Sequence, residues 1–221
     1  MRENNWKQKV AQMENYLPYQ GKKYIAPSKA GEHAIEMEEF KLAGQEARKA
    51  FQTLVASLLG VSNDFRADRV SAWMNQAQVG RPHFWCYFFL EGGTRLEPTF
   101  AVRLKTIAGR LGISCELSFI ERGSTPETLA RQNRVLEVLL DESLDLDGVY
   151  YWAQIAGESY FYNADERSRQ TLKELVEVEN VRKVLVKYDI PALADFASIE
   201  EVCAEIQKGF NKLIPFFEVT R

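Results

Sequence analysis

The chain has 221 residues, 46% of them hydrophobic and 27% charged, fractions that are typical of a globular protein. Its formal net charge of −3 excludes a general electrostatic attraction to nucleic acid or to an anionic membrane. No apolar run reaches the about 18 residues that a transmembrane helix needs, so the sequence predicts no membrane-spanning segment.

The charges are unevenly distributed along the chain. Residues 64–110 contain seven basic and four acidic side chains, whereas residues 141–221 contain nine basic and sixteen acidic ones. If the two segments lie apart in the fold, the molecule has regions of opposite charge.

The three cysteines, Cys86, Cys115 and Cys203, are far apart and odd in number, and each has apolar neighbours. This pattern predicts buried, reduced thiols rather than disulfides, and therefore a cytoplasmic protein. The N-terminal segment MRENNWKQKV has no apolar core of the length found in signal peptides.

Residues 1–30 predict an N-terminal extension with one short helix. Its apolar residues recur at helical spacing: Trp6, Val10, Met13 and Leu17. A longer helix is predicted over residues 32–59, with glutamates in its first turns and Gly60 as its end.

A β-α-β unit is predicted next. Residues 83–90 form an aromatic strand, Pro98 opens a helix that Gly112 ends, and residues 113–120 alternate as a second strand. The connection is long enough for a parallel crossover.

The remaining segments alternate between helix and strand. A helix follows Thr125-Pro126, and a hairpin turns at Ala156-Gly157 between residues 149–155 and 159–162. A helix over 165–178 and a strand over 181–188 come next. The last helix starts with Ser198 and Glu201 as a capping box and ends at Pro215.

These elements predict an α/β or α+β fold. We expect a single mixed sheet of about five strands flanked by helices in one domain over residues 31–221, preceded by the helical extension.

No motif for catalysis or for a cofactor occurs in the chain. Phosphate-binding glycine loops, a nucleophile elbow and paired C-x-x-C cysteines are all missing, and there are only two histidines, His33 and His83. The sequence therefore predicts no catalytic residue, no cofactor and no metal site.

The stretch from Arg69 to Leu90 holds the strongest candidates for a binding site. Arginine, amide and aromatic side chains together are what recognition of an unstacked base requires. The candidates are Arg66, Arg69 and Arg81 for phosphates, Trp73, His83 and Trp85 for stacking, and Asn75, Gln76 and Gln78 for base edges.

A structural interpretation of the same residues stays open. Both faces of the strand over residues 84–90 are apolar, which is typical of a strand buried on both sides. Trp73 can belong to that core, and Asn75 and Gln76 can satisfy backbone groups of the loop.

The hairpin from Tyr150 to Tyr162 carries a second aromatic cluster. Alternation places Tyr150 and Trp152 on one face and Tyr151 on the other. One face is expected in the core. The other is a candidate binding surface or a homodimer contact, with Trp152 as its main binding candidate.

The order of these features resembles the recognition domains that precede the motor in modified-cytosine-dependent restriction systems of the McrB type. The resemblance rests on the tryptophan-containing loop before an aromatic strand (Trp73 to Phe89), the tyrosine-rich hairpin and the closing helix IEEVCAEIQKGFNKLIPFF. It implies a non-enzymatic DNA-binding module and assigns no pocket residue.

Three functions remain as hypotheses. The preferred one is a non-catalytic binding module for nucleic acid. The alternatives are a small-molecule enzyme or sensor with a pocket around Trp73, His83, Glu116 and Tyr150, and an interaction protein that dimerises through the hairpin.

Overall fold

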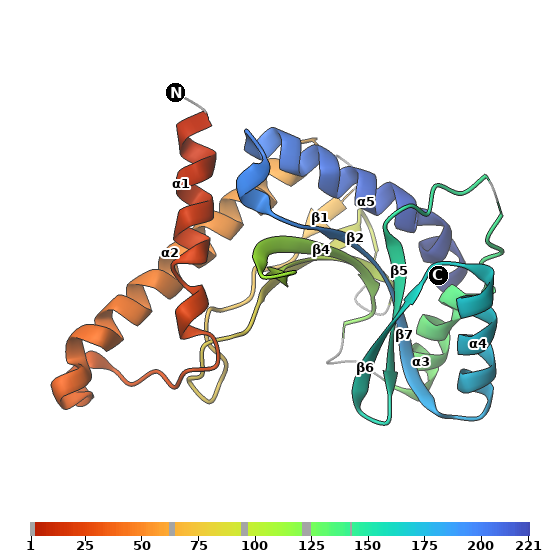
Figure 1. Ribbon diagram of the computed structural model, residues 1–221, viewed down its shortest axis with the longest axis horizontal. Helices are drawn as coiled ribbons and strands as arrows, with labels where there is room; N and C mark the ends of the chain where they lie inside the picture. Colours follow the sequence, from red (N-terminus) through yellow and green to blue (C-terminus); the bar gives the residue numbers. More distant parts are fainter. Residues whose placement is uncertain (1–2, 62–64, 94–96, 121–124, 142) are drawn as a thin grey trace.

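The computed structural model describes residues 3–61, 65–93, 97–120, 125–141 and 143–221 (Figure 1). This part of the chain contains five α-helices and seven strands. They are α1 (Glu3–Glu14), α2 (Ala34–Val61), β1 (Phe65–Ala67), β2 (Phe84–Leu90), β3 (Thr99–Ile107), β4 (Arg110–Ser118), α3 (Pro126–Asn133), β5 (Val149–Ile155), β6 (Glu158–Asn163), α4 (Glu166–Glu177), β7 (Val181–Ile190) and α5 (Ile199–Thr220).

The strands form one sheet in the order β1-β2-β3-β4-β7-β5-β6, and every neighbouring pair is antiparallel. The predicted combination of helices with a single sheet is confirmed. The predicted strand number was wrong, because the sheet has seven strands rather than about five. The expected mixture of parallel and antiparallel pairs was also wrong.

The helix predicted after Pro98 is the main error of the sequence-based prediction, because this segment is a strand. Residues Thr99 to Ile107 form strand β3, which pairs along its whole length with β4 through a tight turn at Ala108-Gly109. Both turn residues have positive φ, at 48° and 80°, as a two-residue hairpin requires. Gly112 is therefore no helix end but a strand residue, where a Cβ would lie 2.7 Å from the carbonyl oxygen of Ile190.

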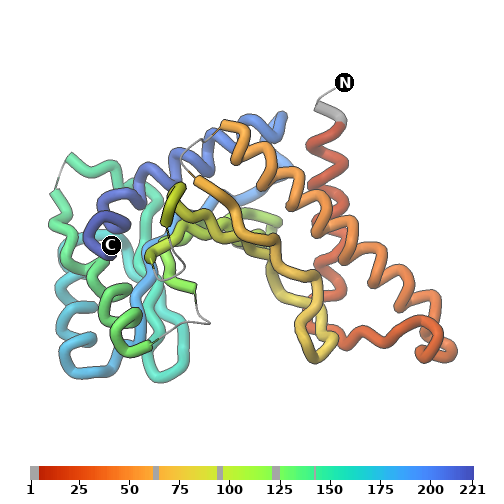
Figure 2. The backbone as a smooth tube through the Cα atoms, turned by 180° about the vertical axis from the view of Figure 1, so that it is seen from behind, coloured from red at the N-terminus to blue at the C-terminus, as the bar shows by residue number. Residues whose placement is uncertain are grey.

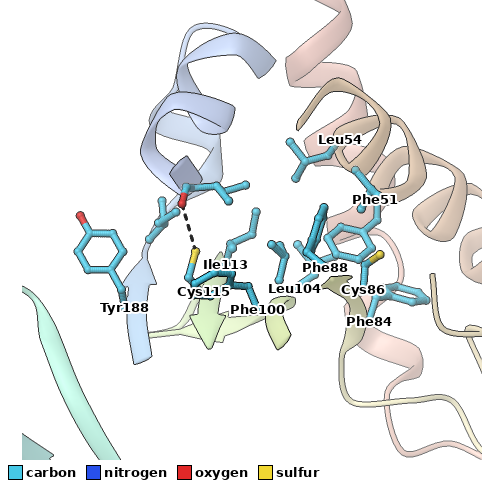
Figure 3. Close-up of a cluster of buried hydrophobic side chains, with 14 of the residues drawn as sticks. Phe51, Leu54, Phe84, Cys86, Phe88, Phe100, Leu104, Ile113, Cys115 and Tyr188 are labelled. Atoms are coloured by element: carbon cyan, nitrogen blue, oxygen red, sulfur yellow. Dashed lines mark hydrogen bonds between the residues drawn. The ribbon is translucent and has the colours of Figure 1, made fainter. Parts of the chain in front are cut away.

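Helices α2 and α5 cover one face of the sheet, and the core lies between them and the strands (Figure 3). Alternate residues of each central strand point into it, among them Phe84, Cys86, Phe88, Phe100, Leu104, Ile113 and Cys115. Helix α5 approaches closely because residue 209 is a glycine. A Cβ there would lie 2.7 Å from the ring of Tyr188 and 3.1 Å from the Cys115 Sγ atom.

Helix α5 begins at the predicted N-cap and ends later than predicted. The predicted capping box forms only in part, because the Glu201 carboxylate accepts its hydrogen bond from the Ala197 N–H at 2.9 Å and not from Ser198. The Ser198 side chain accepts a hydrogen bond from the Glu201 backbone N–H at 3.3 Å. The helix then continues through Pro215 to Thr220, so the predicted end at this proline was wrong. An internal proline costs about 3 kcal/mol. Burial of Phe216 and Phe217 offsets this cost.

The predicted helices over residues 32–59 and 165–178 and the hairpin at Ala156-Gly157 are confirmed as α2, α4 and β5–β6. The predicted end at Gly60 was wrong, because α2 continues through this residue to Val61. The helix predicted after Thr125 is shorter than expected: α3 ends at Asn133, and a 3-10 turn over Arg134–Glu137 follows. All three cysteines are free and buried, as predicted.

Residues of the predicted N-terminal extension contribute to the main core. Helix α1 packs against α2, and the Trp6 indole N–H donates a hydrogen bond to the Leu193 carbonyl oxygen at 3.1 Å. Trp6, Val10, Met13 and Tyr16 are buried in the same cluster as the sheet residues. No helix in the described ranges is long and apolar enough to cross a membrane.

A candidate binding surface on the open sheet face

The sheet has a second face, which points away from α5. Figures 1 and 2 show the sheet arching beneath α2 and α5, with α3 and α4 beside its β5–β6 end and the underside of the arch without a helix of its own. We call this side the open face. Strand register assigns to it Trp85, Tyr87, Phe89, Arg103, Lys105, Ser114, Glu116, Tyr150, Trp152, Phe161, Lys183, Lys187 and Asp189.

A buried ion cluster lies at the centre of the open face. Glu116 of β4 is completely buried and lies between two cations. Its Oε2 atom is 2.9 Å from Arg103 Nε on β3, and its Oε1 atom is 2.7 Å from Lys187 Nζ on β7. Burial alone would raise the pKa of Glu116, but Lys187 and Arg103 lower it to about 2. The three groups carry a formal charge of +1. Burial lowers the pKa of Lys187, and the charge of Glu116 opposes this shift.

A tryptophan lies on each side of this cluster, and both rings have cations over them. The Arg81 and Arg103 guanidinium groups are 4.7 Å and 5.6 Å from the Trp85 ring centroid. The Lys187 ammonium group is 4.9 Å from the ring of Trp152, and Lys183 follows at 5.7 Å. Alternating rings and cations across the strands form a surface that suits a flat anionic ligand.

His83 lies at the start of β2, with its ring centroid 5.6 Å from that of Trp85. Burial and the nearby charge of Arg103 lower the pKa of His83 to about 4. The imidazole is therefore neutral at pH 7 and adds no charge to the open face. It keeps one N–H donor and one acceptor nitrogen.

Three hydroxyl and carboxylate oxygens meet at the β5 side of the cluster. Tyr150 Oη, Ser114 Oγ and Asp189 Oδ1 are buried, and none of them makes a hydrogen bond of normal geometry within the described residues. Burial raises the pKa of Tyr150, and Asp189 raises it further. The other carboxylate oxygen of Asp189 is 3.5 Å from Lys105 Nζ. Tyr150, Phe161 and Asp189 also line a cavity of about 600 Å³.

The open face is basic although the chain is acidic. Arg81 and four basic side chains on this face of β3 and β7 (Arg103, Lys105, Lys183 and Lys187) lie with two carboxylates, Glu116 and Asp189. The formal balance of these seven side chains is +3, against −3 for the whole chain. Such segregation raises the local concentration of an anionic ligand.

The structure brings some of the candidates from the sequence together on this surface. Arg81, His83 and Trp152 lie on or beside the open face. Arg66 is exposed at the β1 edge, with its guanidinium group 4.9 Å from the ring centroid of Phe89. Of the small-molecule pocket proposed from the sequence, His83, Glu116 and Tyr150 share this face.

The other candidates lie elsewhere. Trp73 is buried beneath α2, where a Cβ on Gly44 would lie 2.6 Å from its ring. Asn75 uses its side-chain oxygen to accept a hydrogen bond from the Val79 backbone N–H at 3.0 Å. Arg69 and Gln76 are exposed on the connection between β1 and β2.

Sequence reasoning missed Arg103, Lys105, Lys187 and Asp189. The sequence predicted a helix over residues 97–111. A helix has no sheet face, so the prediction assigned Arg103 no neighbours on adjacent strands. The signal was present as alternation, because Phe100, Val102 and Leu104 point into the core while the residues between them include Arg103.

No model of a known protein family matches the chain, and a search of curated proteins finds no similar sequence.

Proposed function

We propose that this chain is a binding module that takes single-stranded nucleic acid on its open face. The observation that carries the proposal is the combination of aromatic rings with a local charge of +3 on one sheet face of an acidic chain. Proteins that bind single strands use this combination, because cations attract the phosphates while aromatic rings stack on the bases.

The residues have different roles in this proposal. Arg81, Lys105 and Lys183 are partly exposed and contact phosphates. Trp85 and Trp152 stack on bases. Glu116 holds Arg103 and Lys187 in place by hydrogen bonds at 2.9 Å and 2.7 Å, so the central positive charge is fixed before a ligand arrives.

A single strand fits this surface better than a duplex. Ring stacking needs bases that are already unstacked, and a duplex presents only base edges and phosphates. The resemblance to McrB-type recognition domains implies DNA, and a DNA ligand would occupy the same face.

Fluorescence anisotropy tests the proposal with a labelled mixed-sequence strand of about 12 nucleotides, as DNA and as RNA, and with its duplex. We expect the single strands to bind more tightly than the duplex. The affinity should fall with salt at a log–log slope of about −2 to −3, which corresponds to three or four phosphates. Absence of binding at low salt would reject the proposal.

Two tryptophan variants add a matched comparison. Trp85→Leu removes a ring from the open face and should weaken binding about tenfold, the loss expected for one stacked base. Trp73→Phe changes a buried ring beneath α2 and should leave the affinity unchanged. A loss only in Trp73→Phe would instead favour the β1–β2 connection as the binding site.

A second candidate function is small-molecule binding. The buried oxygens of Tyr150, Ser114 and Asp189 and the adjoining cavity of about 600 Å³ favour it. A metabolite screen by thermal shift distinguishes the two functions, because a bound compound raises the melting temperature. The shift should disappear in Tyr150→Phe if the compound uses this hydroxyl.

A further inference from the structure

Strand β6 ends the sheet, and among the described residues no strand pairs with its outer edge. Glu158 to Phe161 and Asn163 are exposed, and Tyr162 is half-buried. The exposed fractions of Phe161 and Tyr160 are 65% and 41%. An edge strand that is rich in aromatic residues and contains no proline or lysine lacks the usual protection against pairing with another chain.

The turn determines which backbone groups of β6 face outward. Ala156 and Gly157 have φ values of 50° and 88°, and Ile155 pairs with Glu158 to close a two-residue hairpin. The closing pair of such a hairpin exchanges backbone hydrogen bonds, and the bonded pairs then alternate along the strands. Glu158, Tyr160 and Tyr162 therefore bond to β5. The N–H and C=O groups of Ser159, Phe161 and Asn163 point outward.

We infer that β6 pairs in antiparallel orientation with β6 of a second copy of this chain, about a two-fold axis at Phe161. The three outward-facing residues are evenly spaced on both sides of this residue. Phe161 of one copy then lies opposite Phe161 of the other, and Ser159 lies opposite Asn163. This register uses every outward N–H and C=O group of the three residues, in about six backbone hydrogen bonds.

The side chains fit the same register. Phe161 belongs to the open face, so the two copies bring these rings together on that side, while Tyr160 lies opposite Tyr162 on the other side. Cross-strand aromatic pairs of this kind stabilise antiparallel sheets. The only charged residue of β6, Glu158, lies outside the segment that pairs, so no like charges oppose each other.

Other antiparallel registers fit less well. In a register centred on Tyr160, the backbone groups that lie opposite each other already bond to β5. They are therefore not available for pairing with a second copy. A register centred between two residues would put the open face of one copy beside the covered face of the other, because side chains alternate along a strand. With the axis at Phe161, one continuous sheet crosses both copies, and the two basic open faces lie on the same side.

Cysteine cross-linking tests the register. Phe161→Cys should form a disulfide-linked dimer under mild oxidation, because residues directly opposite each other lie within disulfide reach. Ser159→Cys alone should not, whereas a mixture of Ser159→Cys with Asn163→Cys should. The native cysteines are buried and serve as an internal control. Cross-linking of Ser159→Cys alone, or none in the mixture, would overturn the register.

Sedimentation equilibrium tests the dimer without relying on a cysteine. The wild-type chain should show a concentration-dependent dimer, and Phe161→Lys should sediment as a monomer, since a charge at the centre of the edge blocks pairing. Val178→Lys makes the same change at a residue that is 63% exposed elsewhere on the molecule and should leave the dimer intact. A wild-type monomer at all concentrations, or equal effects of both variants, would overturn the inference.

Discussion

At the residue scale, the buried ion cluster governs both the stability and the charge of the open face. Glu116 is fully buried, and the side chains of Arg103 and Lys187 retain only 18% and 10% of their exposure. Charges that leave water in this way need partners, because the cost of desolvation exceeds the strength of a single ordinary hydrogen bond. The carboxylate serves two cations, so its loss affects both.

Glu116→Gln should therefore destabilise the fold strongly. The substitution leaves two buried cations without their counter-ion, and breaking a buried ion pair typically costs about 3–5 kcal/mol. Urea denaturation measures the free energy of unfolding. The double variant Glu116→Gln with Lys187→Met should recover part of the loss, because it removes one of the two unpaired charges. A loss below about 0.5 kcal/mol, typical of an exposed site, would contradict this account of the cluster.

His83 predicts a dependence of stability on pH. Burial, together with the charge of Arg103, lowers its pKa from 6.5 to about 4. Between these two values the unfolded chain takes up a proton at this residue and the folded chain does not. The free energy of unfolding therefore falls as the pH drops from 6.5 towards 4.

Thermal unfolding of the wild type and of His83→Gln across this pH range checks the prediction. The melting temperature should fall further on acidification in the wild type than in the variant, because the variant lacks the titrating group. Glu116 is present in both proteins, so its own contribution to the pH dependence cancels in the comparison. Parallel curves for the two proteins would show that His83 is not buried in its neutral form.

At the element scale, the distance between α5 and the sheet depends on Gly209. Its Cβ position lies 2.7 Å from the Tyr188 ring, whereas nothing lies within 4 Å of the corresponding position on Gly60 of α2. Gly209→Ala should destabilise the fold by about 1–3 kcal/mol through overpacking. Gly60→Ala should stabilise it by up to about 1 kcal/mol, because alanine favours helix and meets no neighbour. Chemical denaturation of both variants measures the contrast, and equal effects would contradict the close approach of α5.

The elements also show what the sequence could predict. Helices α2 and α4 each have apolar residues at one clear helical period, and the β5–β6 hairpin has a turn with a clear sequence signature. All three were predicted. The segment over residues 97–111 satisfies two periods. Phe100, Leu104 and Ile107 fit a helix, but Phe100, Val102 and Leu104 alternate as in a strand. Pairing with β4 decides between the two, and this contact is not local in the sequence.

The end of α5 failed for a related reason. A proline normally ends a helix, and this local rule placed the end at Pro215. Phe216 in the following turn is buried against Tyr151 of β5, with ring centroids 6.1 Å apart, so packing outweighs the local cost. For the candidate site, loop composition pointed to Arg81 and His83, but only the strand register could add Arg103, Lys187 and Asp189.

At the scale of the whole molecule, the fold separates charge in a way that the linear sequence shows only in part. Residues 64–110 are basic, and they supply Arg81, Arg103 and Lys105. The segment over residues 141–221 is acidic overall, yet Lys183 and Lys187 of β7 join the same face because β7 pairs between β4 and β5. Seven of the sixteen acidic residues of this segment lie on helices α4 and α5, whereas Lys183 and Lys187 add to the positive charge of the open face.

The central claim is that the open face binds a single-stranded nucleic acid, and charge reversal on two surfaces tests it most directly. Arg81→Glu with Lys183→Glu reverses two charges at the open face. Lys7→Glu with Lys49→Glu makes the same change at exposed residues of α1 and α2. Both variants have the same net charge, so a general electrostatic effect would be equal in both.

Affinity for a labelled single strand is measured at several salt concentrations. We expect the open-face variant to bind at least about tenfold more weakly than the wild type, with a log–log salt slope that is smaller in magnitude by about 1.4, the value for two lost phosphate contacts. The helix variant should bind within about twofold of the wild type, because distant surface charges are screened by salt. Equal losses in the two variants, or no loss in the open-face variant, would contradict the proposed binding surface.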